Sequence, residues 1–201
     1  MGRNIGLGYL WLYPRSGTEA NVGVGSIDSK DVVSILTNFI KNKPELRHAK
    51  IVDKNGDTIP YSGLLPNFVD NGALLIGDAA GQVSNLVGGG VETTLVGAKM
   101  ASQTITESVK LQNYSAEHLK IYEDNYRNSY AGINVQKTAK YLSKIIELSK
   151  KKDLFVYIEE ILEDIEPDFI NEIVGGNFPK VMFIKELLKH PLLLTLLKQF
   201  I

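Results

Sequence analysis

The chain has 201 residues, 44% of them hydrophobic and 22% charged, which is typical of a globular protein with one ordinary domain or two small ones. Its net charge is -1. General nucleic-acid binding requires an excess of basic residues, so we expect no nucleic-acid partner. The lack of cysteine excludes disulfides, thiolate metal sites and a cysteine nucleophile in this chain. No signal-peptide pattern opens the sequence and no apolar run reaches the roughly 18 residues of a membrane span. These features favour a cytoplasmic location.

The first predicted elements are two strands. Residues 7–13 are rich in aromatic and aliphatic side chains, and residues 20–27 resume an extended pattern. The segment between them, residues 14–19, carries the Pro, Ser and Gly of a turn. We therefore expect a β-hairpin at the start of the chain.

A helix and a second hairpin are predicted next. Asp28 or Ser29 can cap a helix that runs to about Lys43, just before a proline. Residues 49–62 are expected to form a short hairpin, because residues 54–57 contain the Asn-Gly pair of a tight turn.

The second half of the chain is predicted to be mainly helical. Residues 73–76 form a short, wholly apolar strand, as expected for a strand buried on both faces. A helix with small residues on one side is expected from Gly88 to about Val109. Further helical segments follow, interrupted by prolines and a Gly-Gly pair, at about residues 116–130, 133–151, 153–165, 167–175 and 179–200.

The chemistry-bearing motif lies where the apolar strand ends. Gly77 lets the backbone pass close to a ligand, and Asp78 lies at the carboxyl end of the strand, where open α/β sheets bind ligands. The Asp78 carboxylate can accept hydrogen bonds from ribose or ribityl hydroxyls. The triple glycine 88–90 then opens a helix, whose free N–H groups and positive dipole end suit an electron-rich group.

This pattern resembles the second flavin motif of FAD enzymes that are similar to the aromatic hydroxylases. Those enzymes read GDAAH or GDAAG and then P-x-x-G-x-G, and in this sequence Asn85 stands where proline is usual. The resemblance implies FAD as the cofactor. The residues expected to hold it are Gly77, Asp78, Gly88, Gly89, Gly90 and Val91.

A second motif narrows the family. The run Tyr-Leu-Trp-Leu-Tyr-Pro at residues 9–14, followed by Gly-Val-Gly at 23–25, resembles the Y-x-W-x-F-P-x(7–8)-G-x-G signature of the geranylgeranyl reductase family. Alternate strand residues share a face, so the aromatic rings are expected to line one side of the first strand beside a gap left by the glycines. Such a slot would fit an isoprenoid chain. The residues expected to bind substrate are Tyr9, Trp11, Tyr13, Pro14, Gly23 and Gly25.

The resemblance implies an α+β fold, a fragment of an α/β flavoprotein. Residues 1–65 are expected to form part of a substrate-binding antiparallel sheet, and residues 66–112 the last strand and helix of an FAD-binding domain. Residues 113–201 are expected to be a helical C-terminal region. The family's G-x-G-x-x-G motif for the FAD pyrophosphate is not found after a strand in this sequence. We therefore expect a fragment, corresponding to the C-terminal half of the family, that by itself binds FAD weakly or not at all and is inactive.

The implied function is an FAD-dependent prenyl reductase of lipid biosynthesis. Reduced FAD would deliver a hydride to an isolated C=C of an isoprenoid lipid or a prenyl diphosphate, and a proton would be added at the neighbouring carbon. NAD(P)H or ferredoxin would be the external electron donor. The sequence names no catalytic residue and no metal ligands. The alternatives are a flavin monooxygenase, a FixC-like electron-transfer flavoprotein, and a non-catalytic lipid-binding module.

The last segment of the chain is strongly amphipathic. Residues 178–201 alternate leucine-rich and polar positions at helical spacing, and Lys150, Lys151 and Lys152 form a basic run before it. The simpler interpretation is a helix that packs on the domain or on a partner. The alternative is an interfacial helix that makes peripheral contact with a membrane holding the lipid substrate.

Overall fold

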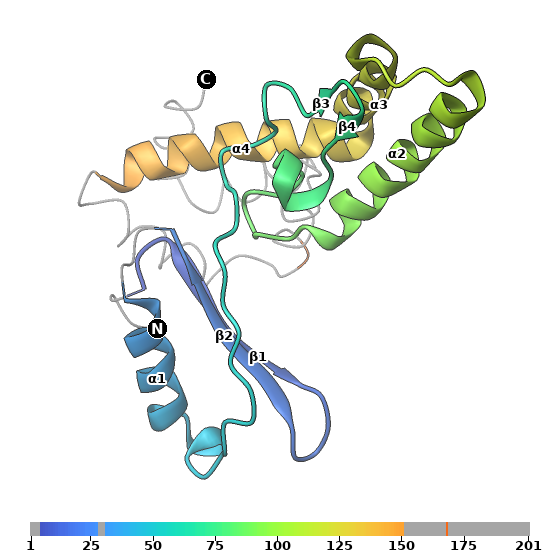
Figure 1. Cartoon of the computed structure of the whole chain (residues 1–201). Helices are drawn as coiled ribbons and strands as arrows, with labels where there is room; N and C mark the ends of the chain where they lie inside the picture. The colour runs from blue at the N-terminus through green and yellow to red at the C-terminus, as the bar shows by residue number, and fades with distance from the viewer. Residues whose placement is uncertain (1–4, 28–30, 151–167, 169–201) are drawn as a thin grey trace. The chain divides into compact units, whose positions relative to one another are not determined.

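The computed structural model describes residues 5–27, 31–150 and 168, and the chain divides into two compact units, Met1–Asp57 and Thr58–Ile201. The helices predicted after residue 151 lie, apart from Asp168, outside the described residues. Within the described part, no helix is long and apolar enough to cross a membrane. The predicted mixture of helices with small antiparallel sheets is confirmed (Figure 1).

The first unit is built on the predicted hairpin. Strands β1 (Gly8–Pro14) and β2 (Ala20–Ser26) pair antiparallel, with Trp11 opposite Gly23. One face carries the aromatic residues of β1. The other carries partly buried aliphatic side chains, Leu10 and Leu12 of β1 with Val22 and Val24 of β2.

Helix α1 (Val32–Asn42) packs alongside β2 in the same unit (Figure 1). The predicted cap at Asp28 or Ser29 is wrong, because the carboxylate of Asp31 accepts a hydrogen bond from the Ser34 N–H (3.0 Å) and so starts the helix later. A one-turn 3-10 helix, η1 (Pro44–Leu46), follows, as expected from a proline that cannot continue the helix.

The hairpin predicted over residues 49–62 is wrong. The structure has no strand there, and the Asp53 carboxylate instead bonds locally, accepting from the Lys54 N–H (2.7 Å) and the Asn55 side-chain amide (3.0 Å). An isolated two-stranded hairpin is marginal unless one face is covered. Here the apolar side chains of the segment, Ile51 and Val52 among them, are exposed, so packing does not stabilise the pairing.

The described part of the second unit, residues 58–150, contains a two-stranded ribbon and three long helices. The ribbon pairs β3 (Val69–Asp70) with β4 (Ala73–Leu74), and the 3-10 helix η2 (Gly77–Ala80) follows. The long helices are α2 (Val91–Leu111), α3 (Ala116–Asn128) and α4 (Tyr130–Ser149). The core of this unit is aromatic: the ring of Phe68 meets Tyr122 and Tyr126 of α3 edge-on, at centroid distances of 5.5 and 6.1 Å.

The strand predicted at residues 73–76 is shorter than expected and is not buried on both faces. Only Ala73 and Leu74 pair, and the Leu75 and Ile76 side chains are 41% and 39% exposed. A single two-residue partner strand covers too little of the segment to bury it. The apolar run correctly predicts a strand at this place, but the predicted burial of that strand on both faces is wrong.

The helical predictions hold in outline. Helix α2 begins at Val91 rather than Gly88, because residues 88–90 form a loop in which Gly90 occupies the N-cap position. Helices α3 and α4 match the predicted segments 116–130 and 133–151 within a few residues. Ser115 caps α3 by accepting the His118 N–H (3.3 Å).

Candidate functional site

The strand end leads into a tight turn that only glycine can enter and leave. Gly77 and Gly81, at the two ends of the GDAAG run, both have left-handed backbone, with φ of 63° and 69°. A side chain on Gly81 would also overlap the carbonyl of Gly63. The sequence therefore fixes the path of this turn through its two flanking glycines.

Gln82 anchors the turn from inside the unit. Its side chain is fully buried and accepts a hydrogen bond from the Gly77 N–H (2.9 Å) while its amide donates to the Tyr122 hydroxyl (2.7 Å). The Tyr122 hydroxyl in turn donates to the Leu75 carbonyl (2.9 Å). Gly97 of α2 leaves the room, since a Cβ there would overlap the Gln82 amide. The turn is thus held by a polar chain from α3 to the strand end, buried except at its last link to Leu75.

Asp78 and the start of α2 lie side by side. The exposed carboxylate of Asp78 has no hydrogen bond or ion pair within the described residues, and its Oδ1 lies 3.4 Å from the position of a Cβ on Gly90. Gly90 supplies no side-chain cap to α2. A free carboxylate beside uncapped helix N–H groups offers both acceptors and donors to one ligand, which fits the ribityl hydroxyls and the electron-rich edge of a flavin.

The loop of residues 84–89, which lies between the turn of residues 77–81 and the start of α2, is closed by two backbone hydrogen bonds. The Ser84 N–H donates to the Gly89 carbonyl (2.8 Å) and the Gly88 N–H donates back to the Ser84 carbonyl (2.9 Å). The N–H of Asn85 donates to the Thr138 hydroxyl of α4 (3.3 Å). Proline has no N–H, so a proline at this position could not make the bond to Thr138.

The aromatic residues of β1 form a continuous row on one face of the hairpin. The Tyr9 and Trp11 ring centroids are 5.7 Å apart, and those of Trp11 and Tyr13 are 6.4 Å apart. Tyr9 is 46% exposed and Tyr13 is 61% exposed. Partial burial is the main cause that raises the pKa of Tyr9, and electrostatic interaction with the neighbouring Tyr13 raises this pKa further.

The predicted gap beside this row is filled. A Cβ on Gly23 would overlap the indole of Trp11, so the ring lies across the glycine rather than beside an open slot. The Trp11 indole N–H donates to the Asn21 side chain (2.7 Å), which fixes the ring in that position. The hairpin therefore offers a flat aromatic surface on which an apolar chain can lie, in place of a cleft.

Replacing Gly23 by alanine is expected to displace the Trp11 ring, because the added methyl occupies its position. We expect a loss of about 1–2 kcal/mol in the free energy of unfolding. Trp11 is the only tryptophan in the chain, so its fluorescence should shift to the red as the ring becomes more exposed. The control is Gly17→Ala in the same hairpin, where nothing lies within 4 Å of the new methyl. Equal spectra for both variants would contradict the placement of the ring.

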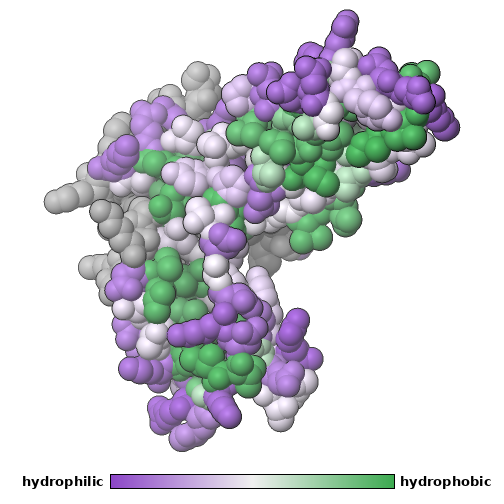
Figure 2. All heavy atoms as spheres, viewed as in Figure 1, coloured by the Kyte–Doolittle hydropathy of each residue, from purple (hydrophilic) through white to green (hydrophobic). Residues whose placement is uncertain are grey.

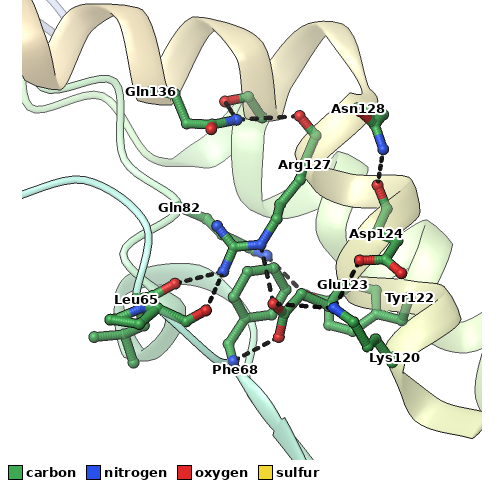
Figure 3. Close-up of polar contacts among 12 residues, drawn as sticks. Leu65, Phe68, Gln82, Lys120, Tyr122, Glu123, Asp124, Arg127, Asn128 and Gln136 are labelled. Atoms are coloured by element: carbon green, nitrogen blue, oxygen red, sulfur yellow. Dashed lines mark hydrogen bonds and ion pairs between the residues drawn. The ribbon is translucent and has the colours of Figure 1, made fainter. Parts of the chain in front are cut away.

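Helix α3 holds the segment 65–68 (Figure 3). This segment lies next to the turn of residues 77–81, which we call the flavin turn after the ligand that the motif predicts. The Arg127 guanidinium donates to the Leu65 and Pro66 carbonyls (2.6 and 2.7 Å) and lies 4.9 Å above the Phe68 ring centroid. Glu123, with its side chain 3% exposed, accepts from Arg127 Nε (3.0 Å) and from the Phe68 N–H (2.9 Å). This segment touches the turn directly, since the Leu65 N–H donates to the Ala80 carbonyl (3.1 Å).

The tyrosines of α3 predict how stability depends on pH. Burial raises the pKa of Tyr122 from its ordinary value of 10 to about 12, and burial also raises the pKa of Tyr126. The unfolded chain ionises first, so stability is full below pH 10 and falls as pH rises from 10 towards 12. From Tyr122 alone we expect a loss of about 1.4 kcal/mol at pH 11 relative to pH 8, measured by urea unfolding. Equal stability at the two pH values would contradict this, and Tyr122→Phe should reduce the difference.

The structure places the predicted site residues in two groups. Gly90 lies against Asp78 in the second unit, which also contains Gly77, Gly88, Gly89 and Val91. The six predicted substrate residues lie in the hairpin of the first unit. Sequence reasoning missed Gln82 and Arg127. An i, i+4 charge pair on α3 was the only available signal for Arg127, and Gln82 carried none. Among the described residues no group of three His, Asp or Glu could hold a metal ion.

Comparison with known proteins shows which family of proteins the chain is similar to. Residues 4–59 match the family model of the geranylgeranyl reductase catalytic domain. The chain also shares its fold with a geranylgeranyl bacteriochlorophyll reductase-like protein from Thermoplasma acidophilum. The TM-score is 0.60 at 24% identity, over 94% of this chain and 49% of that one.

Two curated relatives carry names that are more specific than the description of the family model. The chain is 34% identical to digeranylgeranylglycerophospholipid reductase 3 of Methanosphaera stadtmanae over 75% of this chain and 38% of that protein. It is 31% identical to digeranylgeranylglycerophospholipid reductase of Methanocaldococcus jannaschii over 96% of this chain and 48% of that protein. The chain spans about half the length, or less, of these relatives. The resemblance to the geranylgeranyl reductase family is therefore confirmed.

Proposed function

We propose that this chain is part of an FAD-dependent reductase that saturates C=C bonds in the isoprenoid chains of lipids. The observation that carries the proposal is the 31% identity to a digeranylgeranylglycerophospholipid reductase over 96% of the chain, a range that includes both motifs. The free Asp78 carboxylate beside the uncapped start of α2 supports the flavin half of the proposal.

The flavin would be held by the second unit. Asp78 would accept hydrogen bonds from ribityl hydroxyls, and the N–H groups at the start of α2 would donate to the carbonyl edge of the isoalloxazine. When bound and reduced, FAD supplies the hydride for the C=C bond. The buried chain from Gln82 to Tyr122 keeps the turn in place, so the protein's own contribution here is binding and orientation.

The isoprenoid chain would lie on the aromatic row of the hairpin. Tyr9, Trp11 and Tyr13 present ring faces and edges over three alternate strand positions, a surface that suits an extended apolar chain. Gly23 contributes by letting the Trp11 ring lie flat against the sheet.

Several finer properties belong to the same proposal. NAD(P)H or ferredoxin would reduce the flavin, and contact with the lipid substrate would be peripheral to the membrane. The 201-residue chain by itself would hold FAD weakly or not at all, because its sequence supplies the ribityl and isoalloxazine side but no G-x-G-x-x-G motif for the pyrophosphate. A flavin spectrum that persists after gel filtration of the purified chain would contradict this last point.

The proposal is tested in a hybrid in which this chain replaces the matched region of the Methanocaldococcus jannaschii reductase. With dithionite as reductant, mass spectrometry should show two added hydrogens per double bond of a digeranylgeranyl lipid. Trp11→Ala should lower turnover roughly tenfold, the effect of about 1.4 kcal/mol, with flavin content unchanged. Asp78→Ala should lower flavin content, and Arg15→Ala, in the exposed hairpin turn, should change neither.

Three other outcomes of these experiments would contradict the proposal. Oxygen incorporated into the substrate would indicate a monooxygenase. A hybrid that binds lipid but never acquires flavin would indicate a binding module. Equal loss of turnover and flavin content in Trp11→Ala would contradict the separate roles given to the hairpin and the flavin turn.

A further inference from the structure

The sequence contains two Asn-Gly pairs, and the structure places them in different surroundings. They are Asn55-Gly56 and Asn71-Gly72. Asparagine is chemically labile in proteins, and a following glycine has no side chain to hinder the approach of its backbone nitrogen to the asparagine amide. Both asparagines are exposed, so access to water does not distinguish them. Their hydrogen bonds do.

The second pair is held in a turn. Asn71 and Gly72 join β3 to β4 and lie against the start of α3. The side-chain oxygen of Asn71 accepts a hydrogen bond from the Ala116 N–H (2.8 Å), and the Gly72 N–H donates to the Tyr114 carbonyl (2.7 Å). The nitrogen that would attack and the amide that it would attack are therefore both engaged. Reaction at Asn71 requires local opening of this turn.

The first pair has no such support. Residues 49–61 form neither helix nor strand, and within the described part of the chain the Gly56 N–H makes no hydrogen bond. A Cβ on Gly56 would meet nothing within 4 Å. The Asn55 amide donates to the Asp53 carboxylate (3.0 Å), an exposed contact that water can replace. Figure 2, viewed as in Figure 1, shows hydrophilic surface where this segment lies.

We propose that Asn55 is a site of spontaneous deamidation and that the fold protects Asn71 from the same reaction. The Gly56 nitrogen bonds to Cγ of Asn55, and the bond from Cγ to the side-chain nitrogen breaks. That nitrogen leaves as ammonia, with the proton of the Gly56 N–H. Water then opens the cyclic imide at either carbonyl and gives aspartate or isoaspartate. The reaction consumes only water and needs no cofactor, so it is independent of flavin and lipid.

The product changes the segment that leads from the first unit to the second, which begins at Thr58. Asn55 lies between Asp53 and Asp57, so a new carboxylate gives three acidic side chains at alternate positions. The net charge of the chain, -1, becomes more negative by one charge. In the isoaspartate form the main chain also gains one carbon atom at this position. The connecting segment of an aged chain is therefore both more acidic and longer.

The test is peptide mapping by mass spectrometry of the full 201-residue chain during incubation in mildly alkaline buffer. Chymotryptic cleavage after Tyr61 places the two pairs on separate peptides. In the folded chain Asn55 should be converted at least about tenfold faster than Asn71, because Asn71 must first leave its hydrogen bonds. In guanidinium chloride, where the turn is lost, the two rates should agree within about threefold. Equal rates in the folded chain, or a tenfold difference that persists after unfolding, would overturn the proposal.

Two variants address the two pairs separately. Gly56→Ala should slow conversion of Asn55 severalfold by hindering the attacking nitrogen, and its methyl has open space in the fold. Ala116→Pro removes the N–H that holds Asn71 but suits the first position of α3, so it should speed conversion of Asn71 severalfold and leave Asn55 unchanged. Melting curves establish that each variant is folded. Failure of Gly56→Ala to slow Asn55, or of folded Ala116→Pro to speed Asn71, would overturn the proposal.

Discussion

Gln82→Leu is expected to lower the free energy of unfolding by about 3 kcal/mol, although the two side chains are similar in size. The glutamine is fully buried and holds the flavin turn through the Gly77 N–H and the Tyr122 hydroxyl. Leucine offers neither partner. The Gly77 N–H then stays buried without an acceptor, which by itself costs about 1–3 kcal/mol. The loss of the donor to Tyr122 adds to this.

The measurement is urea or guanidinium unfolding of the full chain, with Gln103→Leu as the matched control. Gln103 lies on the exposed face of α2, so its replacement should change the free energy of unfolding by less than about 0.5 kcal/mol. A second check uses Gly97, which leaves room for the Gln82 amide. Gly97→Ala combined with Gln82→Ala should cost less than the sum of the two single changes, because the smaller side chain makes room for the methyl. Strict additivity would show that the two residues do not meet.

The elements that the sequence predicted well are those with a strong local signal. The hairpin of β1 and β2 combines aromatic strand residues with a turn rich in Ser and Gly, and residues 8–26 fold as expected. Helices α3 and α4 have periodic apolar positions and, for α3, a serine cap. In each case the predicting signal lies in residues close together in the sequence, although α3 itself is held by distant partners such as Leu65 and Phe68.

The predictions that failed depended on partners far away in the sequence. The Asn-Gly signal of residues 54–57 is local, but a hairpin there also needs a covered face, and its apolar side chains are exposed. The apolar strand 73–76 signals burial between neighbours that the described residues do not supply. The prediction of a slot beside Trp11 is wrong for a different reason. The glycines predict empty space beside the aromatic row, but the Trp11 ring itself fills that space.

The site was predicted as a set of positions but not as a supported structure. Gly77, Asp78 and the triple glycine follow from the motif, whereas Gln82 and the segment 63–68 beneath the turn do not. Contacts from Gln82 to Tyr122 join residues forty positions apart, and no short pattern encodes them. The motif therefore predicts which residues would meet a flavin, and the tertiary structure shows what keeps those residues in place.

Arg127→Ala is expected to lower the free energy of unfolding by about 3 kcal/mol, because it breaks a largely buried ion pair by removing one partner. The Glu123 carboxylate, 3% exposed in the folded chain, would lose its guanidinium partner, and the Leu65 and Pro66 carbonyls would lose their donor. Arg127→Lys should recover less than half of the loss, since an ammonium group cannot reproduce the guanidinium fork or its contact with the Phe68 face.

The matched control for Arg127 is Lys120→Ala on the same helix. Lys120 pairs with Asp124 at 2.8 Å and lies 3.9 Å from Glu123 Oε1, but its own side chain is 54% exposed, so its loss should cost less than about 1 kcal/mol. A double-mutant cycle of Arg127→Ala with Glu123→Gln isolates the coupling between the two buried partners. Equal effects of Arg127→Ala and Lys120→Ala would contradict the clamp.

The same variant connects stability to flavin binding. Arg127 holds the carbonyls of Leu65 and Pro66, and the Leu65 N–H supports the turn at Ala80, two residues after Asp78. In the hybrid reductase, Arg127→Ala should therefore weaken FAD binding at temperatures where the protein is still folded, whereas Lys120→Ala should not. Unchanged FAD affinity in a folded Arg127→Ala hybrid would show that the clamp stabilises the second unit without positioning its flavin turn.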